Sequence, residues 1–205
     1  MRRLRVALRV EQENWNAALE IKMNSQFDTR HLEIALSWLW VVVHTRLGLA
    51  AMSLDQQWHY FRAAQFIPAW LGDDLGYLGY GTEALVHLGD SFLPIDKPDD
   101  ARLAWEKAAR EPRGPLDSLC YWKAKALENL GYPEAAGRLW QRMDRQADWR
   151  LAMRHPARPY LLYLKSLACF GLGDTEGAQS AFHAAYGAGL TWLGRCRASQ
   201  DAACY

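Results

Sequence analysis

The sequence predicts an all-α protein built from repeated helix pairs, and two observations support this class. Long stretches of the 205 residues carry apolar side chains three and four positions apart, which is the spacing of one face of a helix. Glycines also recur at a constant interval of 42 residues, at Gly89, Gly131 and Gly173. An interval of this size is typical of stacked supersecondary units.

The clearest unit lies between residues 120 and 143. Gly131 suits the left-handed residue that ends a helix, because glycine has no Cβ to clash there. Pro133 suits the first position of the next helix, where its missing N–H is not needed. We therefore expect two amphipathic helices joined by a tight turn.

A stripe of small, aromatic and small side chains follows each glycine at steps of four and three, so its members share one helix face. The three stripes are Ala101, Trp105 and Ala108; Ala136, Trp140 and Met143; and Ala178, Phe182 and Ala185. In the second and third copies the stripe starts five residues after the glycine. In the first copy it starts 12 residues after it, because a predicted loop, SFLPIDKPDD, occupies residues 91–100.

This unit resembles the tetratricopeptide repeat (TPR) family in its glycine, its alanine–aromatic–small stripe and a small residue seven positions before the glycine. The last feature is filled by Thr82, Ala124 and Ser166. The tryptophan expected near the start of each unit is missing. The family period is roughly 34 residues, so extra residues lie between or inside the helix pairs here. Over about residues 75–190 the resemblance implies a TPR-like α-solenoid of antiparallel helix pairs forming a right-handed superhelix.

A narrower resemblance rests on three runs of sequence, residues 66–90, 99–112 and 121–140. They are similar to the C-terminal helical repeats of large bacterial proteins that carry an N-terminal β-sandwich of unknown function and tend to be associated with carbohydrate use. Nothing in this chain resembles the sandwich. The resemblance implies that the chain is the repeat portion, with such a sandwich as one partner.

The remaining elements are predicted from local patterns. We expect helices over residues 1–23, 30–48 and 54–70, and connectors at 111–117 and about 147–159. The glycine-rich segment 71–81 reads as an open loop that becomes helical from about residue 78. A final short helix is expected after Gly189. These elements divide into a first domain of divergent helices, 1–72, and a second of three TPR-like pairs with a C-terminal cap, 73–205.

Composition limits the class of protein. The formal net charge of +1 argues against binding nucleic acid or an anionic membrane through a global field. Residues 34–43 form the longest apolar run, which is far short of the ~20 residues that span a bilayer. No secretory leader pattern is visible, so a cytoplasmic protein is expected. Cys120 and Cys169 lie in apolar helical patterns and are expected to be buried, reduced thiols.

Enzyme chemistry has little support in the sequence, and we expect no catalytic residue, cofactor or metal ion. None of the common hydrolase, metalloprotease or phosphate-loop motifs occurs. Glu83 and His87 are four residues apart on one helix face, where a local surface pair is the expected interpretation. Asp73 and Asp74 read as a helix start rather than a catalytic pair.

The family resemblance implies a concave groove lined by the first helix of each unit. Its predicted lining residues are Glu83, His87, Tyr121, Lys125, Asn129, Tyr160, Tyr163 and Leu167. The expected function is a non-catalytic scaffold that binds a peptide, a protein or a partner domain in this groove. The alternative is a helical accessory module of a carbohydrate-active bacterial enzyme. An enzyme site of that kind would bring two carboxylates to within ~5–10 Å in an aromatic-lined cleft.

Overall fold

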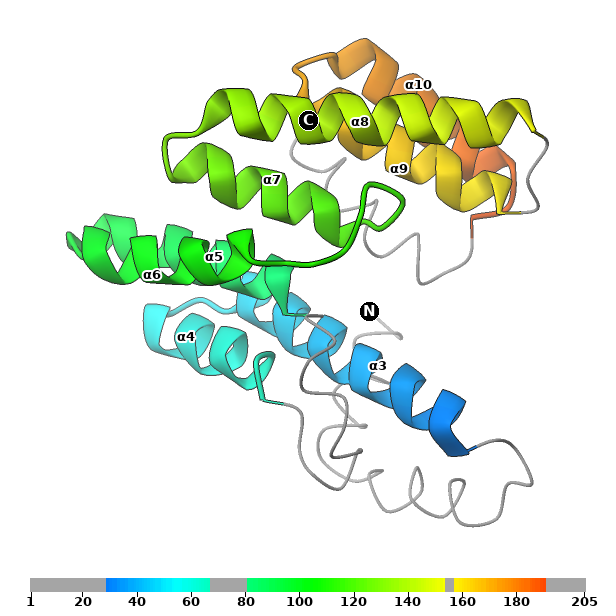
Figure 1. Cartoon of the computed structure of the whole chain (residues 1–205). Helices are drawn as coiled ribbons and strands as arrows, with labels where there is room; N and C mark the ends of the chain where they lie inside the picture. Colours follow the sequence, from blue (N-terminus) through cyan, green and yellow to red (C-terminus); the bar gives the residue numbers. More distant parts are fainter. Residues whose placement is uncertain (1–28, 67–80, 154–156, 191–205) are drawn as a thin grey trace. The chain divides into compact units, whose positions relative to one another are not determined.

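A computed structural model describes residues 29–66, 81–153 and 157–190 (Figure 1). Within these ranges every regular element is helical and no strand occurs, so the all-α class is confirmed. The chain divides into two compact units, residues 1–91 and 92–205. The predicted boundary at 72/73, the predicted helix over 1–23, the segment 71–80 and the predicted final helix lie outside the described residues.

Of the described helices, three belong mainly to the first unit: α3 (Thr29–Ala50), α4 (Leu54–Ala63) and α5 (Thr82–Phe92). The second unit begins with a short 3-10 turn, η3 (Leu93–Ile95), and continues with α6 (Pro98–Ala109), α7 (Leu119–Asn129), α8 (Pro133–Ala152), α9 (Arg158–Gly171) and α10 (Thr175–Gly187). Helix α3 matches the helix predicted at 30–48. No helix in the described ranges combines the length and the apolarity needed to cross a membrane.

In the described part of the first unit, indole N–H groups of two tryptophans connect the helices. Trp40 Nε1 on α3 donates to the carbonyl of Ala63 at the end of α4, at 3.0 Å. Trp58 Nε1 on α4 donates to Ser91 Oγ at the end of α5, also at 3.0 Å. Both indoles are half-buried, and these bonds connect α4 to α3 and to α5.

Helix α4 is shorter than predicted, because it ends at Ala63 rather than at residue 70. The N–H of its C-cap residue, Ala64, donates to the carbonyl of Tyr60, and the N–H of Gln65 donates to that of Arg62, which closes the last turn. Asp55 lies in the first turn, as predicted, next to the N-cap Ser53.

The repeat implies that Gly89, like Gly131, ends a helix, and this prediction is wrong. Gly89 lies inside α5, which continues to Phe92, and it has no positive φ. The left-handed residue of this region is instead Asp96, with φ 57° after the 3-10 turn. The loop predicted at 91–100 is correspondingly shorter, because Pro98 already starts α6. Asp99 and Asp100 lie in the first turn of α6, as expected from the helix dipole.

The predictions for Gly131 and Gly173 are confirmed. Both have positive φ, 84° and 79°, and each follows a helix end. At the first turn the N–H of Gly131 donates to the carbonyl of Glu128, and that of Tyr132 to Leu127. This is the Schellman arrangement, in which a left-handed residue satisfies the last carbonyls of a helix. The same pair of bonds recurs at Gly173, and again at Gly189, which has φ 87°.

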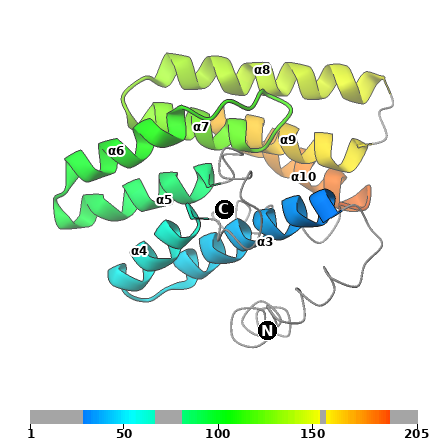
Figure 2. The ribbon, with the colours of Figure 1, turned by 60° about the horizontal axis from the view of Figure 1, so that its bottom comes forward.

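Consecutive helices of the second unit pack against each other from α6 to α10, and α7 also contacts α9. Figures 1 and 2 show α7 and α8 as an antiparallel pair. The core lies where the predicted stripes meet the facing helices. All three small–aromatic–small stripes are buried except Phe182, which is half-buried against the core.

Trp140 is the largest member of the α8 stripe, and its indole lies directly on the backbone of α9. A Cβ placed on Gly171 would lie 2.4 Å from Cδ2 and Cε2 of Trp140. Glycine at 171 therefore permits a close approach that no other residue allows without displacing the ring. Helix α8 also runs five residues past the predicted start of the connector at 147, because Ala147 continues the buried stripe.

Candidate functional site: a basic groove between α7 and α8

Three of the residues predicted to line a concave groove are buried in the core of the second unit. Tyr121 and Tyr163 expose 4% and 1% of their surface, and Leu167 exposes 1%. The Tyr121 ring lies 6.2 Å from that of Trp140 and 6.3 Å from that of Phe170. These side chains pack between helices and present no surface to a ligand, so their predicted role as groove lining is corrected.

Three further predicted residues of the second unit are half-buried and engaged locally. Lys125 Nζ pairs with Glu128 Oε2 one turn further along α7. Asn129 ends α7. The phenolic oxygen of Tyr160 accepts a hydrogen bond from the N–H of Ser118 at 3.1 Å, and its ring centroid lies 6.3 Å from that of Tyr163. Tyr160 thereby joins the start of α9 to the start of α7, which is a structural role.

The last two predicted residues, Glu83 and His87, belong to the first unit and form no surface pair. Glu83 is buried, and its Oε1 lies 3.0 Å from Arg46 NH1 on α3. The His87 ring stacks on Phe61, with centroids 5.9 Å apart and planes at 25°. Burial lowers the pKa of His87, against the opposing charges of Glu83 and Asp90. This environment disfavours a charged imidazole and gives Glu83 a partner other than His87.

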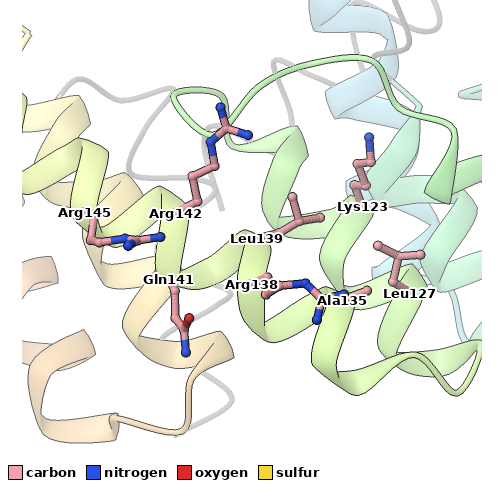
Figure 3. Close-up of a pocket in the computed structure, with 8 residues that line it drawn as sticks. All are labelled: Lys123, Leu127, Ala135, Arg138, Leu139, Gln141, Arg142 and Arg145. Carbon is pink, nitrogen blue, oxygen red and sulfur yellow. The ribbon is translucent and has the colours of Figure 1, made fainter.

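A different surface of the second unit has the geometry of a binding site. An open groove of about 520 Å³ runs between α7 and α8 (Figure 3). Its lining residues are Lys123 and Leu127 from α7, and Ala135, Arg138, Leu139, Gln141, Arg142 and Arg145 from α8. We call this site the basic groove. It combines four cationic side chains with an apolar floor of Leu127, Ala135 and Leu139.

The sequence places the three arginines of the basic groove in a row. Arg138, Arg142 and Arg145 are four and three residues apart on α8, so they share one helix face. The buried stripe of the same helix, which contains Trp140, occupies the opposite face. Packing of that stripe onto the core therefore turns the whole arginine row toward solvent, and all three arginines are exposed.

Within the described residues, no opposite charge pairs with the arginine row. No carboxylate of the described residues forms an ion pair with Arg138, Arg142 or Arg145, and no acidic residue lines the groove. Like charges at this helix spacing destabilise a helix by about 0.2–0.5 kcal/mol per pair. Lys123 is anchored at the edge of the groove, because its Nζ donates to the carbonyl of Glu111 at 2.6 Å.

The basic groove is on a different side of α7 from the predicted one. Lys123 and Leu127 line it, whereas Tyr121 and Lys125, two residues away from Lys123, were predicted as lining. Residues two apart on a helix do not share a face. The sequence nevertheless carried a usable signal, namely three arginines at 138, 142 and 145 that share one helix face.

The side chains of the basic groove favour binding over catalysis. The groove contains no carboxylate, histidine, cysteine or hydroxyl group that could act as acid, base or nucleophile. In the described parts of the chain no group of three histidine, cysteine, aspartate or glutamate residues could hold a metal ion. The lining also lacks aromatic rings, which sugar and nucleobase sites use for stacking. Arginine forks above an apolar floor suit carboxylates carried on a partly apolar ligand.

Comparison with known proteins supplies no family for this arrangement. The chain matches no family model, no curated protein and no solved structure.

Proposed function

We propose that this chain is a non-catalytic helical-repeat scaffold, of the TPR type that its sequence resembles, which binds a partner protein. The observation that carries the proposal is the basic groove, an open surface with an uncompensated arginine row and an apolar floor. The consecutive packing of α6 to α10 and the recurrent turns at Gly131 and Gly173 support a repeat architecture. The partner then contacts the outward face of α8 instead of the aromatic positions expected from the resemblance.

Charged and apolar groups have separate roles in such a site. Rim charges speed association and select the partner, because opposite charges steer the encounter. Apolar side chains at the centre supply most of the binding free energy once water is excluded. In the basic groove the arginines form the rim, and Leu127 with Leu139 form the centre.

Site-specific photocrosslinking tests this proposal. Gln141 is an exposed lining residue of the groove, and Gln179 is an equally exposed residue on α10. With a photoreactive phenylalanine analogue at each position in turn, we expect a protein to be cross-linked from 141 and not from 179. The same adduct should disappear when Arg138 and Arg142 are both changed to glutamate.

A matched charge variant separates the groove from net charge. Lys107 on α6 and Arg110, the C-cap residue of α6, are exposed and do not line the groove. Lys107→Glu with Arg110→Glu therefore changes the charge by the same amount. This control should keep the cross-link from 141. Equal cross-linking from 141 and 179, or equal loss in both charge variants, would contradict the proposed function.

A further inference from the structure

We propose, resting on the function proposed above, that the segment bound by the basic groove is an acidic amphipathic helix with one apolar anchor. Three properties of the groove carry this inference. They are the spacing of its arginines, the position of its apolar floor and the chemical type of its cations.

The first property is spacing. Arg138 and Arg145 are separated by seven residues, about 10 Å along the axis of α8 at ~1.5 Å per residue. A second helix lying along α8 repeats the same distances, so carboxylates at its positions i, i+4 and i+7 would each face one arginine. The surface between two antiparallel helices is also where a third helix packs, with its side-chain ridge in the groove. The basic groove thus has the form of a helix-binding site.

The second property is the apolar floor. Leu127 on α7 and Leu139 on α8 face the groove together with Ala135, beside the arginine row rather than beyond it. A ligand with charged groups alone would leave these apolar side chains in contact with water, so their burial would contribute no binding free energy. A leucine or similar side chain next to the acidic row of the ligand would fill the floor and remove that water. The volume of about 520 Å³ holds such a side chain with its neighbours.

The third property is the type of cation. Three of the four cations are arginines, whose planar forks bind a carboxylate through two parallel hydrogen bonds. Phosphate groups satisfy the same forks, but single-stranded nucleic acid also requires rings for its bases to stack on. The groove has no aromatic lining residue, so the observations favour a protein segment over RNA.

Binding of synthetic peptides to the full chain tests this inference. The first peptide has about 16 residues, long enough for a marginal helix, with glutamates at i, i+4 and i+7 beside one leucine. The second replaces that leucine by glutamine, and the third replaces the three glutamates by glutamine. Fluorescence anisotropy of each labelled peptide, at low salt and at about 0.15 M, measures affinity. A short single-stranded RNA is the competing ligand class.

We expect the first peptide to bind more tightly than the other two, and to weaken as salt rises. Arg138→Glu with Arg142→Glu should reduce its affinity at least about tenfold, the combined effect of several exposed ion pairs. Leu139→Gln should weaken the first peptide while leaving the second unchanged. Lys107→Glu with Arg110→Glu should bind the first peptide as the wild type does. Circular dichroism of each variant checks that it is folded.

Three results would overturn the inference: equal binding of the first and second peptides, equal binding by the wild type and the groove variant, or tighter groove-dependent binding of the RNA. The outcome is separable from the proposed function. If the cross-link from position 141 depends on Arg138 and Arg142 but no acidic peptide binds, the scaffold stands and the acidic helix is rejected. If both are absent, both proposals are rejected.

Discussion

The phenolic oxygen of Tyr160 accepts the backbone N–H of Ser118 at 3.1 Å, across 42 residues of chain. These two residues stand at the beginning of α9 and just before α7, so one side chain fixes the relative position of two helices that also pack against each other. The interval equals the one between Gly131 and Gly173. The repeat in the sequence therefore appears in the second unit as a direct hydrogen bond from one copy to the next.

Tyr160→Phe removes the acceptor and keeps the ring. Because Ser118 is buried, its N–H would lose this partner without gaining free access to water. We expect the free energy of unfolding to fall by about 0.5–1.5 kcal/mol, measured by urea denaturation. Tyr132→Phe is the matched control, since Tyr132 is 55% exposed and its loss of a hydroxyl should change little. Equal effects of the two changes would contradict the structural role of Tyr160.

Gly171→Ala should destabilise the second unit, because its Cβ would lie 2.4 Å from the buried Trp140 ring. We expect a loss of about 1–3 kcal/mol from overpacking, seen in thermal or urea unfolding. Gly137→Ala is the contrasting variant. Gly137 lies inside α8 with open space around its Cα, so alanine there should stabilise by about 0.5–1 kcal/mol.

The Gly171 effect is specific to one neighbour, which a double-mutant cycle can show. Trp140→Ala by itself should cost roughly 3–5 kcal/mol, as expected for a large buried aromatic residue. In that background Gly171→Ala should cost much less, because the ring is gone. Additive effects would mean that the close contact is not the cause.

Acidification should destabilise the first unit through His87. Burial lowers the pKa of this residue below its ordinary value of about 6.5. Between the two pKa values, the His87 imidazole therefore binds a proton in the unfolded chain and does not bind one in the folded chain. The contribution of neutral His87 to the free energy of unfolding is fully present above about pH 6.5. It is lost as the pH falls toward the pKa of His87 in the folded chain, with a slope of at most about 1.4 kcal/mol per pH unit. His87→Gln should flatten the decline in stability between neutral pH and about pH 5.5, and an unchanged slope would contradict this assignment.

Cys120 and Cys169 should resist alkylation in the folded chain. Both are buried free thiols, as the sequence predicted, and burial raises the pKa of each to about 11. The reactive thiolate is therefore scarce at neutral pH. Mass spectrometry of peptides after brief iodoacetamide treatment should find these two sites unmodified in native protein and modified in urea. Native labelling at the unfolded rate would place them at the surface.

The sequence predicted local structure well wherever backbone chemistry decided it. Gly131 and Pro133 set a helix end and a helix start with three residues between them, and neither depends on the rest of the fold. The prediction that Gly89 ends a helix was wrong because the presence of a glycine in the sequence does not fix its φ. Continued packing of α5 up to the buried Phe92 kept that glycine helical, and Asp96 made the turn instead.

The candidate site was harder to predict, because burial depends on which helices meet. Tyr121 and Tyr163 occupy positions that face a groove under the family resemblance, but here they fill the space between helices. The arginine row of the basic groove was visible in sequence as three residues on one face. The family resemblance instead pointed to the first helix of each unit, whereas this row lies on α8.

The three left-handed turns at Gly131, Gly173 and Gly189 have a stereochemical consequence. Each position has positive φ, and a Cβ added there meets nothing within 4 Å. The penalty for alanine at these sites comes from its chirality, because the left-handed region is the mirror image of the one that L-residues prefer. D-alanine introduced by chemical ligation should therefore be accepted where L-alanine is not. It should even stabilise the helix end, since it restricts the unfolded chain more than glycine does.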